Sequence, residues 1–211
     1  MIDSEQAASD VRQSVSLAAA TLRDLVGRDW QQPAADLKWT VWETIEHIAD
    51  DLFAYAAQIS LDSPPQDDYV GFGWRNIRPD GPALTVYARE GTTPHGLIDV
   101  LLSSGGLLSA TVLTAPADRR AFHPYGVSDP VGFAAMGVIE TLVHMHDVAT
   151  ALDVPWAPPE DLCDRALRRL FPDAPESGDR WADLLWATGR TELPGLPRRT
   201  GWRWDGTVQS R

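Results

Sequence analysis

The sequence predicts an all-α protein: an antiparallel four-helix bundle with a long crossover connection and a short C-terminal helical extension. Three observations lead to this prediction. Four segments carry apolar residues at helical spacing, and two short connections and one long one join them. In addition, 44% of the 211 residues are apolar, as is usual in globular proteins. We therefore divide the chain into a bundle, residues 1–155, and an extension, residues 156–211, that packs on it.

The first two helices are recognised by their apolar spacing and their ends. The first is predicted over residues 4–26 and is closed by Gly27. The second begins at Thr40, because the run Thr40-Val41-Trp42-Glu43 fits a capping box, with a hydroxyl at the cap and a carboxylate three residues later. Its core-facing stripe consists of Ile45, Ile48, Leu52, Tyr55 and Ile59.

The third and fourth helices share one start signal, a capping residue followed by proline at the first helical position. The third begins at Thr93-Pro94 and stops before Pro116. In its middle, Gly105-Gly106 either kinks the helix or permits close packing. The fourth begins at Asp129-Pro130 and runs to about residue 152.

The remaining segments are a crossover and an extension. Four prolines interrupt the long connection, residues 62–91, and we expect a short extended piece at residues 84–88. Connections of this length within a compact domain are often functional. In the extension, short helices are predicted from Pro158-Pro159 to residue 171 and over residues 175–188. An irregular tail follows.

One face of the fourth helix carries a polar stripe. At about 100° per residue, Glu140, His144 and Asp147 lie within roughly 60° of one another. Residues 131–152 contain no Lys, Arg, Gln or Asn, so this helix is predicted to be largely buried. A buried carboxylate costs several kcal/mol unless it is paired or coordinates a metal. Glu140 and His144, one turn apart, are placed to reach one ion from the same helix.

The second helix supplies a candidate third ligand. His47 lies beside its apolar stripe, about two turns from the capped start. Imidazole and carboxylate together suit zinc and other divalent first-row metals. Three protein ligands leave a coordination position open, which is the arrangement of catalytic rather than structural sites.

Simpler interpretations of these residues stay open at this stage. Glu140 and His144 also fit a solvent-facing stripe with a helix-stabilising pair, and His47 fits a hydrogen-bonded histidine at the edge of the core. Asp50 and Asp51 follow closely, and we expect both to be solvated. The alternative for Asp51, one turn after His47, is an outer partner or a competing ligand.

Composition limits the partners of the protein. The formal net charge of −12 argues against nucleic acid or an anionic membrane surface, because both need concentrated positive charge. The single cysteine allows no internal disulfide, the first residues lack a signal-peptide pattern, and the longest apolar run, residues 131–139, is far below the roughly 20 residues of a membrane span. We therefore expect a soluble cytoplasmic protein, monomeric or homodimeric, with small-molecule partners. Simple roles are assigned to the other histidines and the cysteine: solvated for His95 and His123, packing or surface for His146, and buried for Cys163.

Two motifs carry a family resemblance. Residues 39–50, Trp-Thr-Val-Trp-Glu-Thr-Ile-Glu-His-Ile-Ala-Asp, resemble the histidine-bearing second helix of the DinB-like superfamily. Residues 140–147, Glu-Thr-Leu-Val-His-Met-His-Asp, resemble the Glu-x-x-x-His-x-x-Asp motif on the last bundle helix of the mycothiol-dependent maleylpyruvate isomerase N-terminal domain. The similarity spans about residues 5–155, and the motifs have the same order and separation as in that family.

The resemblance implies a site and a cosubstrate. It implies that His47, Glu140 and His144 bind a divalent metal, commonly zinc, and that mycothiol, a low-molecular-weight thiol, is held there as thiolate. It also implies that Asp147 orients a ligand or contacts the thiol. No motif locates the arginine expected for a dicarboxylate substrate, so Arg75 and Arg78 in the crossover are cofactor-binding candidates by location only.

The implied function is a mycothiol-dependent transferase or isomerase, in which the thiolate attacks a small electrophilic substrate. Two alternatives stay open: a non-catalytic, metal-binding stress or binding protein, and a metal-dependent hydrolase that uses bound water. The chain departs from the isomerase after the bundle, where about 55 residues replace a further C-terminal domain, so isomerisation of maleylpyruvate is only one of the reactions expected.

Overall fold

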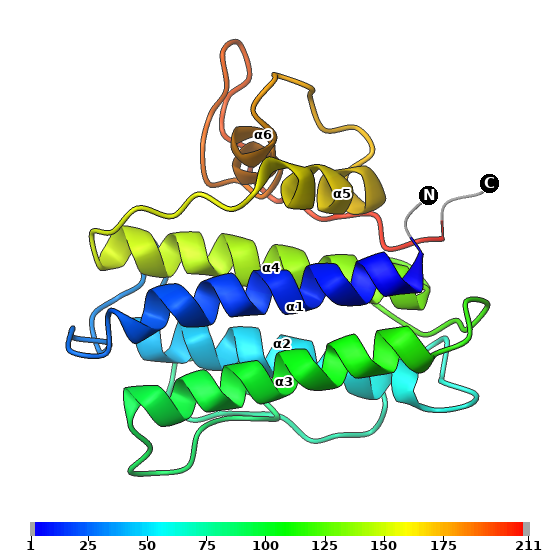
Figure 1. Ribbon diagram of the computed structural model, residues 1–211, viewed down its shortest axis with the longest axis horizontal. Coiled ribbons are helices and arrows are strands. Elements are labelled where there is room, and N and C mark those ends of the chain that lie inside the picture. The colour runs from blue at the N-terminus through cyan, green and yellow to red at the C-terminus, as the bar shows by residue number, and fades with distance from the viewer. Residues whose placement is uncertain (1–2, 209–211) are drawn as a thin grey trace.

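The computed structural model describes residues 3–208 and shows an all-α fold, as predicted, with one two-stranded antiparallel ribbon (Figure 1). This architecture is that of a DinB-like helical bundle. Its elements are α1 (Ser4–Arg23), α2 (Val41–Ser60), β1 (Arg75–Asn76), β2 (Ala83–Leu84), α3 (Pro94–Thr114), α4 (Pro130–Ala151), α5 (Glu160–Leu170) and α6 (Arg180–Ala187).

Side-chain caps fix where the bundle helices begin. The capping box of α2 is formed, since the Thr40 hydroxyl accepts from the Glu43 amide and the Glu43 carboxylate accepts from the Thr40 amide. In α3 and α4 the cap is one-sided: Thr93 accepts from the Gly96 amide and Asp129 from the Gly132 amide, each ahead of a proline. The predicted start of α6 at residue 175 is wrong: Asp179 accepts from the amide of residue 182, so the helix begins at Arg180.

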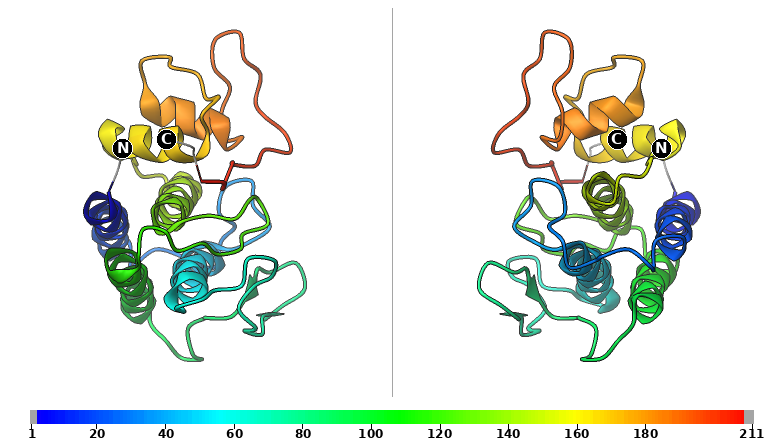
Figure 2. Two further views of the ribbon diagram at one scale, coloured as in Figure 1. Left: turned by 90° about the vertical axis from the view of Figure 1, so that its right-hand side faces the viewer. Right: turned by 90° about the vertical axis from the view of Figure 1, so that its left-hand side faces the viewer.

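The four long helices occupy the corners of a quadrilateral when viewed along the bundle (Figure 2). Each of α1 and α2 packs against both α3 and α4, so α1 and α2 lie on a diagonal. The α1–α3 pair is antiparallel, because Val15 lies beside Gly105 whereas the earlier Ala8 accepts a hydrogen bond from the later Ser109. The α2–α4 pair is also antiparallel (Figure 1). The crossover returns the chain along the bundle, so α2 and α3 run in the same direction.

Small residues let the helices approach closely. A methyl group built on Gly105 would lie 2.7 Å from a Val15 side-chain carbon, so this glycine sets the distance between α3 and α1. Gly106, its neighbour, has nothing within 4 Å of that position. Of the two roles predicted for the glycine pair, close packing therefore applies to Gly105, and α3 runs unbroken past both.

The crossover is held against α2 by two buried carboxylates. Asp50 accepts from the amides of Thr85 and Val86, and Glu46 accepts from the amide of Ala88. These amides therefore bond to side chains rather than to a neighbouring strand, which is why the extended piece predicted at residues 84–88 forms a ladder only at Ala83–Leu84. The prediction that Asp50 is solvated is wrong, because this side chain ties the crossover to the bundle.

The extension covers one side of α4. Helix α5 packs on α4, and α6 packs on α5 (Figures 1 and 2). Arg165 of α5 makes a two-nitrogen ion pair with Asp10 of α1, at 2.8 Å for each contact. In the tail, Arg198 pairs with Asp36 of the α1–α2 connection. The extension is thus joined by ion pairs both to α1 and to the connection between α1 and α2.

Helix α3 is long and apolar enough to cross a membrane by length and composition alone. Polar residues such as His95, Asp99 and Ser104 interrupt its apolar residues, so α3 does not contain the longest unbroken apolar run. Core helices of soluble proteins pass the same test, and here α3 packs against α1 and α2, with Leu97, Leu101, Leu108 and Val112 fully buried.

Candidate metal centre

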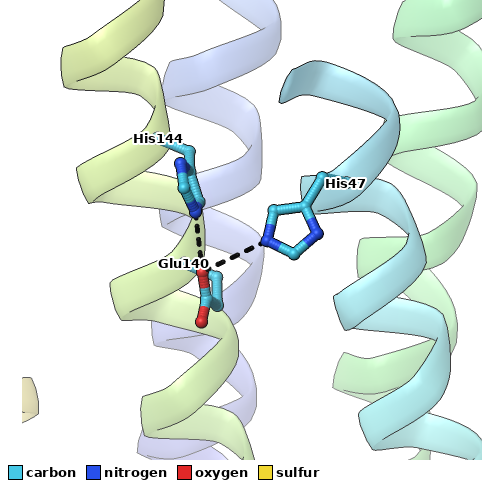
Figure 3. Close-up of side chains that lie close together, drawn as sticks. All are labelled: His47, Glu140 and His144. Carbon is cyan, nitrogen blue, oxygen red and sulfur yellow. Dashed lines mark ion pairs between the residues drawn. The ribbon is translucent and has the colours of Figure 1, made fainter. Parts of the chain in front are cut away.

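Three side chains predicted as metal ligands meet between α2 and α4. The Glu140 Oε2 atom lies 3.1 Å from His144 Nε2 and 3.9 Å from His47 Nε2 (Figure 3). One donor atom of each residue lies within 4.8 Å of the other two. The i, i+4 spacing on α4 aligns Glu140 with His144, and the antiparallel packing of α2 brings His47 to the same level.

This geometry fits a small divalent cation. In tetrahedral coordination with ligand bonds of about 2.0–2.1 Å, donor atoms are about 3.3 Å apart. The two distances to Glu140 bracket that value, and the donor atoms of His47 and His144 lie within 4.8 Å of each other. Within residues 3–208, no further His, Cys, Asp or Glu joins this group. Three ligands of this kind leave one position open to a fourth, non-protein ligand.

Asp147 orients the His144 ring. Its Oδ2 atom lies 3.1 Å from His144 Nδ1, and because a carboxylate only accepts, Nδ1 carries the proton. The Nε2 atom faces Glu140, and once it has lost its proton its lone pair would be free to bind a metal there. Arg190 holds Asp147 in turn, with Nη2 at 2.9 Å from Oδ2. The hydrogen bonds that His144 and Arg190 donate outweigh burial and lower the pKa of Asp147, so it stays ionised.

The two imidazoles have opposite electrostatic environments. Burial and the positive field of His144 lower the pKa of His47 to about 4, so His47 is neutral at physiological pH, as a metal ligand must be. Burial also opposes protonation of His144, but its hydrogen bonds to Asp147 and Glu140 prevail and raise its pKa. The same contact with His144 overcomes burial and lowers the pKa of Glu140. The site therefore presents an ionised carboxylate between one neutral and one readily protonated imidazole.

Asp51 is part of this environment rather than a solvated acid, which corrects the expectation for it. Its Oδ2 atom lies 3.3 Å from His47 Nε2, one turn away on α2. Burial, followed by the negative charges of Glu140 and Asp50, raises its pKa well above the usual value. It stands next to the ligand set without completing it. Asp51 and Glu140 face the same nitrogen of His47, so of the two alternatives that the sequence left open, the position of Asp51 fits a competing ligand rather than an outer partner.

The site is narrow but reaches solvent. The exposed fractions of the His47, Glu140 and His144 side chains are 19%, 13% and 10%. The Trp39 ring packs edge-on against His47, with centroids 4.6 Å apart, and its centroid lies 6.0 Å from that of His144. Trp39 thus covers the two imidazoles on one side. A ligand must therefore enter beside an aromatic wall.

His123 is buried between α2, α4 and the C-terminal tail, contrary to the expectation that it is solvated. Its ring contacts Tyr55 of α2, Phe133 of α4 and Trp204 of the tail. Burial lowers its pKa to about 4 despite the nearby negative charge of Glu140. The connection between α3 and α4 folds back onto the bundle, which the local sequence around His123 does not reveal.

The simple roles assigned to two other residues are confirmed. His146 packs against Trp181 of α6, with ring centroids 5.9 Å apart. Cys163 is buried on α5, where burial raises the pKa of its thiol to about 12. Neither side chain reaches the metal centre, and the thiol stays protonated and unreactive.

Comparison with known families agrees with this geometry. A model of the mycothiol maleylpyruvate isomerase N-terminal domain family matches residues 11–149, well over half of the chain. The chain belongs to this family. Comparisons with curated proteins and with solved structures return no match. The family points to a mycothiol-related, metal-binding role with a thiol-type small molecule as partner, and His47, Glu140 and His144 all lie within the matched residues.

The two arginines predicted by location have other contacts. Arg78 makes a two-nitrogen ion pair with Glu43, at 2.6 Å for each contact, and so braces the capping box of α2. Arg75 of β1 donates to the Tyr87 hydroxyl. Neither has a contact with the three ligands among the interactions of the described residues. A role in cofactor binding for Arg75 and Arg78 stays a prediction.

Sequence reasoning missed Arg190. It lies just after α6, outside the residues that the mycothiol maleylpyruvate isomerase N-terminal domain model matches, and 43 positions from its partner Asp147. Its surroundings in the sequence carry no motif. Only the pairing of an arginine with a buried carboxylate, once the fold is known, identifies it.

Proposed function

We propose that the protein is a metal-dependent enzyme that uses a low-molecular-weight thiol of the mycothiol type to attack a small electrophile, as a transferase or an isomerase. The observation that carries this proposal is the convergence of His47, Glu140 and His144, with one position open, in a chain that belongs to a mycothiol-related family. Zinc is the metal we propose, because two imidazoles and one carboxylate suit it.

The residues of the chain have separate tasks in this scheme. His47, Glu140 and His144 would hold the cation, and Asp147 keeps the proton on Nδ1 of His144, so that Nε2 is free to coordinate. Trp39 limits the entry of water. When bound, the cation supplies positive charge that lowers the pKa of a thiol and keeps its sulfur anionic at neutral pH.

The thiol reaction has two outcomes. The thiol loses its proton to solvent, and its sulfur forms a bond to an electrophilic carbon. In a transferase, the leaving group departs with its electron pair, and the thiol stays attached. In an isomerase, the sulfur adds to one carbon of an activated carbon–carbon double bond, and the π electrons move onto the conjugated carbonyl group. After rotation about the resulting single bond, these electrons re-form the double bond, the carbon–sulfur bond breaks, and the sulfur leaves as thiolate.

A decisive experiment incubates zinc-loaded protein with mycothiol and an alkylating electrophile, and detects the conjugate by mass spectrometry. We expect conjugate with the wild-type protein and none above background with His144→Ala. The matched control is His95→Ala, an exposed histidine at the start of α3, which should retain full activity. Full activity in His144→Ala would contradict the proposal.

The same assay separates the two rival functions. Thiol-independent cleavage of an ester or amide would identify a hydrolase that uses the same ligands. Tight metal binding without turnover of any tested electrophile would identify a non-catalytic binding protein. The open coordination position favours the enzymatic reading over the second of these.

A further inference from the structure

In the described part of the C-terminal extension, residues 156–208, Arg190 contacts the metal centre by bonding to Asp147. No residue of the extension lies in the part of the chain that the family model matches. We propose that Arg190 is a positioning residue of the metal centre: it holds Asp147 in the orientation that directs His144 toward the cation. The proposal rests on the proposed function, because it concerns the same metal.

The contact geometry supports this role. Arg190 Nη2 lies 2.9 Å from Asp147 Oδ2, and Arg190 Nε lies 3.4 Å from Oδ1. Asp147 Oδ2 also accepts from His144 Nδ1 at 3.1 Å. A continuous chain of hydrogen bonds therefore leads from the extension to a metal ligand. The Asp147 side chain is only 6% exposed, so its contacts are mainly with protein groups rather than with bulk water.

Arg190 is not free to bind a substrate. Its third nitrogen, Nη1, donates to the Thr188 carbonyl at 2.9 Å, so each of its nitrogens has a protein acceptor. A planar guanidinium that grips a carboxylate with two nitrogens fixes both distance and orientation. Such a fork is suited to aligning Asp147 rather than to recognising a ligand that comes and goes.

The extension is folded so as to present this side chain. Helix α6 ends at Ala187, and Gly189, two residues later, adopts a positive φ of 70°. A methyl group there would lie 2.7 Å from the Arg199 carbonyl oxygen and 2.9 Å from the Trp202 ring, so only glycine fits. Trp202 also lies over the Arg190 guanidinium, 5.7 Å from ring centroid to Cζ. The tail thus wraps the turn that carries Arg190.

The chain offers a matched control. Arg165 of α5 also joins the extension to a buried bundle carboxylate, Asp10, with two nitrogens at 2.8 Å. This pair lies near the start of α4, beside Val131 and Ala134, rather than at the ligands. Removing it should weaken the attachment of the extension and leave the metal centre intact.

The test measures zinc affinity by competition with a chromophoric chelator, at a temperature where circular dichroism shows each variant folded. Outer partners of metal ligands are worth about 10- to 100-fold in affinity. We expect Arg190→Gln to weaken zinc binding about tenfold or more. Arg190→Lys, which keeps the charge without the fork, should give an intermediate affinity. Arg165→Gln should bind zinc as the wild type does.

A double variant shows whether Arg190 acts through Asp147. If it does, Asp147→Asn combined with Arg190→Gln binds zinc no more weakly than Asp147→Asn alone, so the two losses are not additive. Wild-type affinity in both Arg190 variants, or additive losses in the double variant, would overturn the inference. A wild-type protein that does not bind zinc would instead overturn the proposed function, so the two failures are distinguishable.

Discussion

The two antiparallel helix pairs of the bundle are built differently. In the α1–α3 pair, Gly105 packs on Val15, and the Ser109 hydroxyl donates to the Ala8 carbonyl. Both of these contacts are made between groups of the protein itself and need no ligand. In the α2–α4 pair, Glu140 is a nearly buried carboxylate. Its ion-pair partners are the imidazoles of His47 and His144 rather than an arginine.

This difference separates structure from function within one bundle. A buried charge is tolerated when it is paired and hydrogen-bonded. In the α1–α3 pair the charge at the contact meets that condition, because Arg12 donates to the Ser109 hydroxyl. The α2–α4 pair keeps a carboxylate facing a neutral His47. Changes in the first pair should therefore affect folding stability, and changes in the second should affect ligand binding.

The largest effect is expected from Glu140→Gln. Loss of a direct ligand should weaken zinc binding by more than about 100-fold, since even outer partners are worth 10- to 100-fold. Chelator competition measures this affinity. Wild-type zinc affinity in Glu140→Gln would mean that Glu140 is not a ligand, and the contrast between the pairs would disappear.

The next largest effect is the pH dependence of folding stability that comes from His123, which packs between α2 and α4. The folded pKa of His123 is lowered to about 4 from an unfolded value of 6.5. The unfolded chain therefore binds a proton first as pH falls, so this stability is present above pH 6.5 and is lost between pH 6.5 and pH 4. The loss amounts to about 3 kcal/mol.

Substitution of His123 isolates this contribution. His123→Phe keeps an aromatic ring against Tyr55 and Phe133 but cannot be protonated. Urea unfolding of the metal-free protein at several pH values should show a shallower loss of stability in this variant than in the wild type. Parallel curves for the two proteins would show that His123 is not the source of the pH dependence.

A smaller effect is expected in the α1–α3 pair from Gly105→Ala. The new methyl group would meet Val15 at 2.7 Å, and overpacking of this kind costs about 1–3 kcal/mol. Gly106→Ala is the control: its methyl group meets nothing within 4 Å, and alanine favours helix by about 1 kcal/mol. Thermal unfolding should move in opposite directions for the two variants, with zinc affinity unchanged in both. Altered zinc affinity in either would show that the two pairs are coupled.

The smallest effect is expected from Ser109→Ala in the same pair. It removes the hydrogen bond to the Ala8 carbonyl and the one received from Arg12. Arg12 is exposed, so water replaces the bond that it donates, and the loss comes from the bond to Ala8. A typical hydrogen bond contributes about 1 kcal/mol to stability. Chemical unfolding should report a loss of about that size, and a change in zinc affinity instead would contradict the division of roles between the pairs.

The sequence predicted most of what depends on local geometry. The starts of α2, α3 and α4 follow from caps and prolines within four residues of one another, because the bonds that begin a helix are local. The alignment of Glu140 with His144 follows from helical periodicity alone. The place of His47 beside them came from the family resemblance, since no local pattern joins two helices.

What only the tertiary structure decided depends on residues far apart in the chain. In the folded chain Arg190 lies against Asp147, His123 is buried between α2 and α4, and Asp50 bonds to the crossover. These arrangements arise when packing removes a charged or polar group from water and another segment must supply its partner. The local sequence around such a group does not encode which segment that will be. The chain alone therefore determined the helices and the ligand stripe, and the packing of the extension and connections determined what surrounds them.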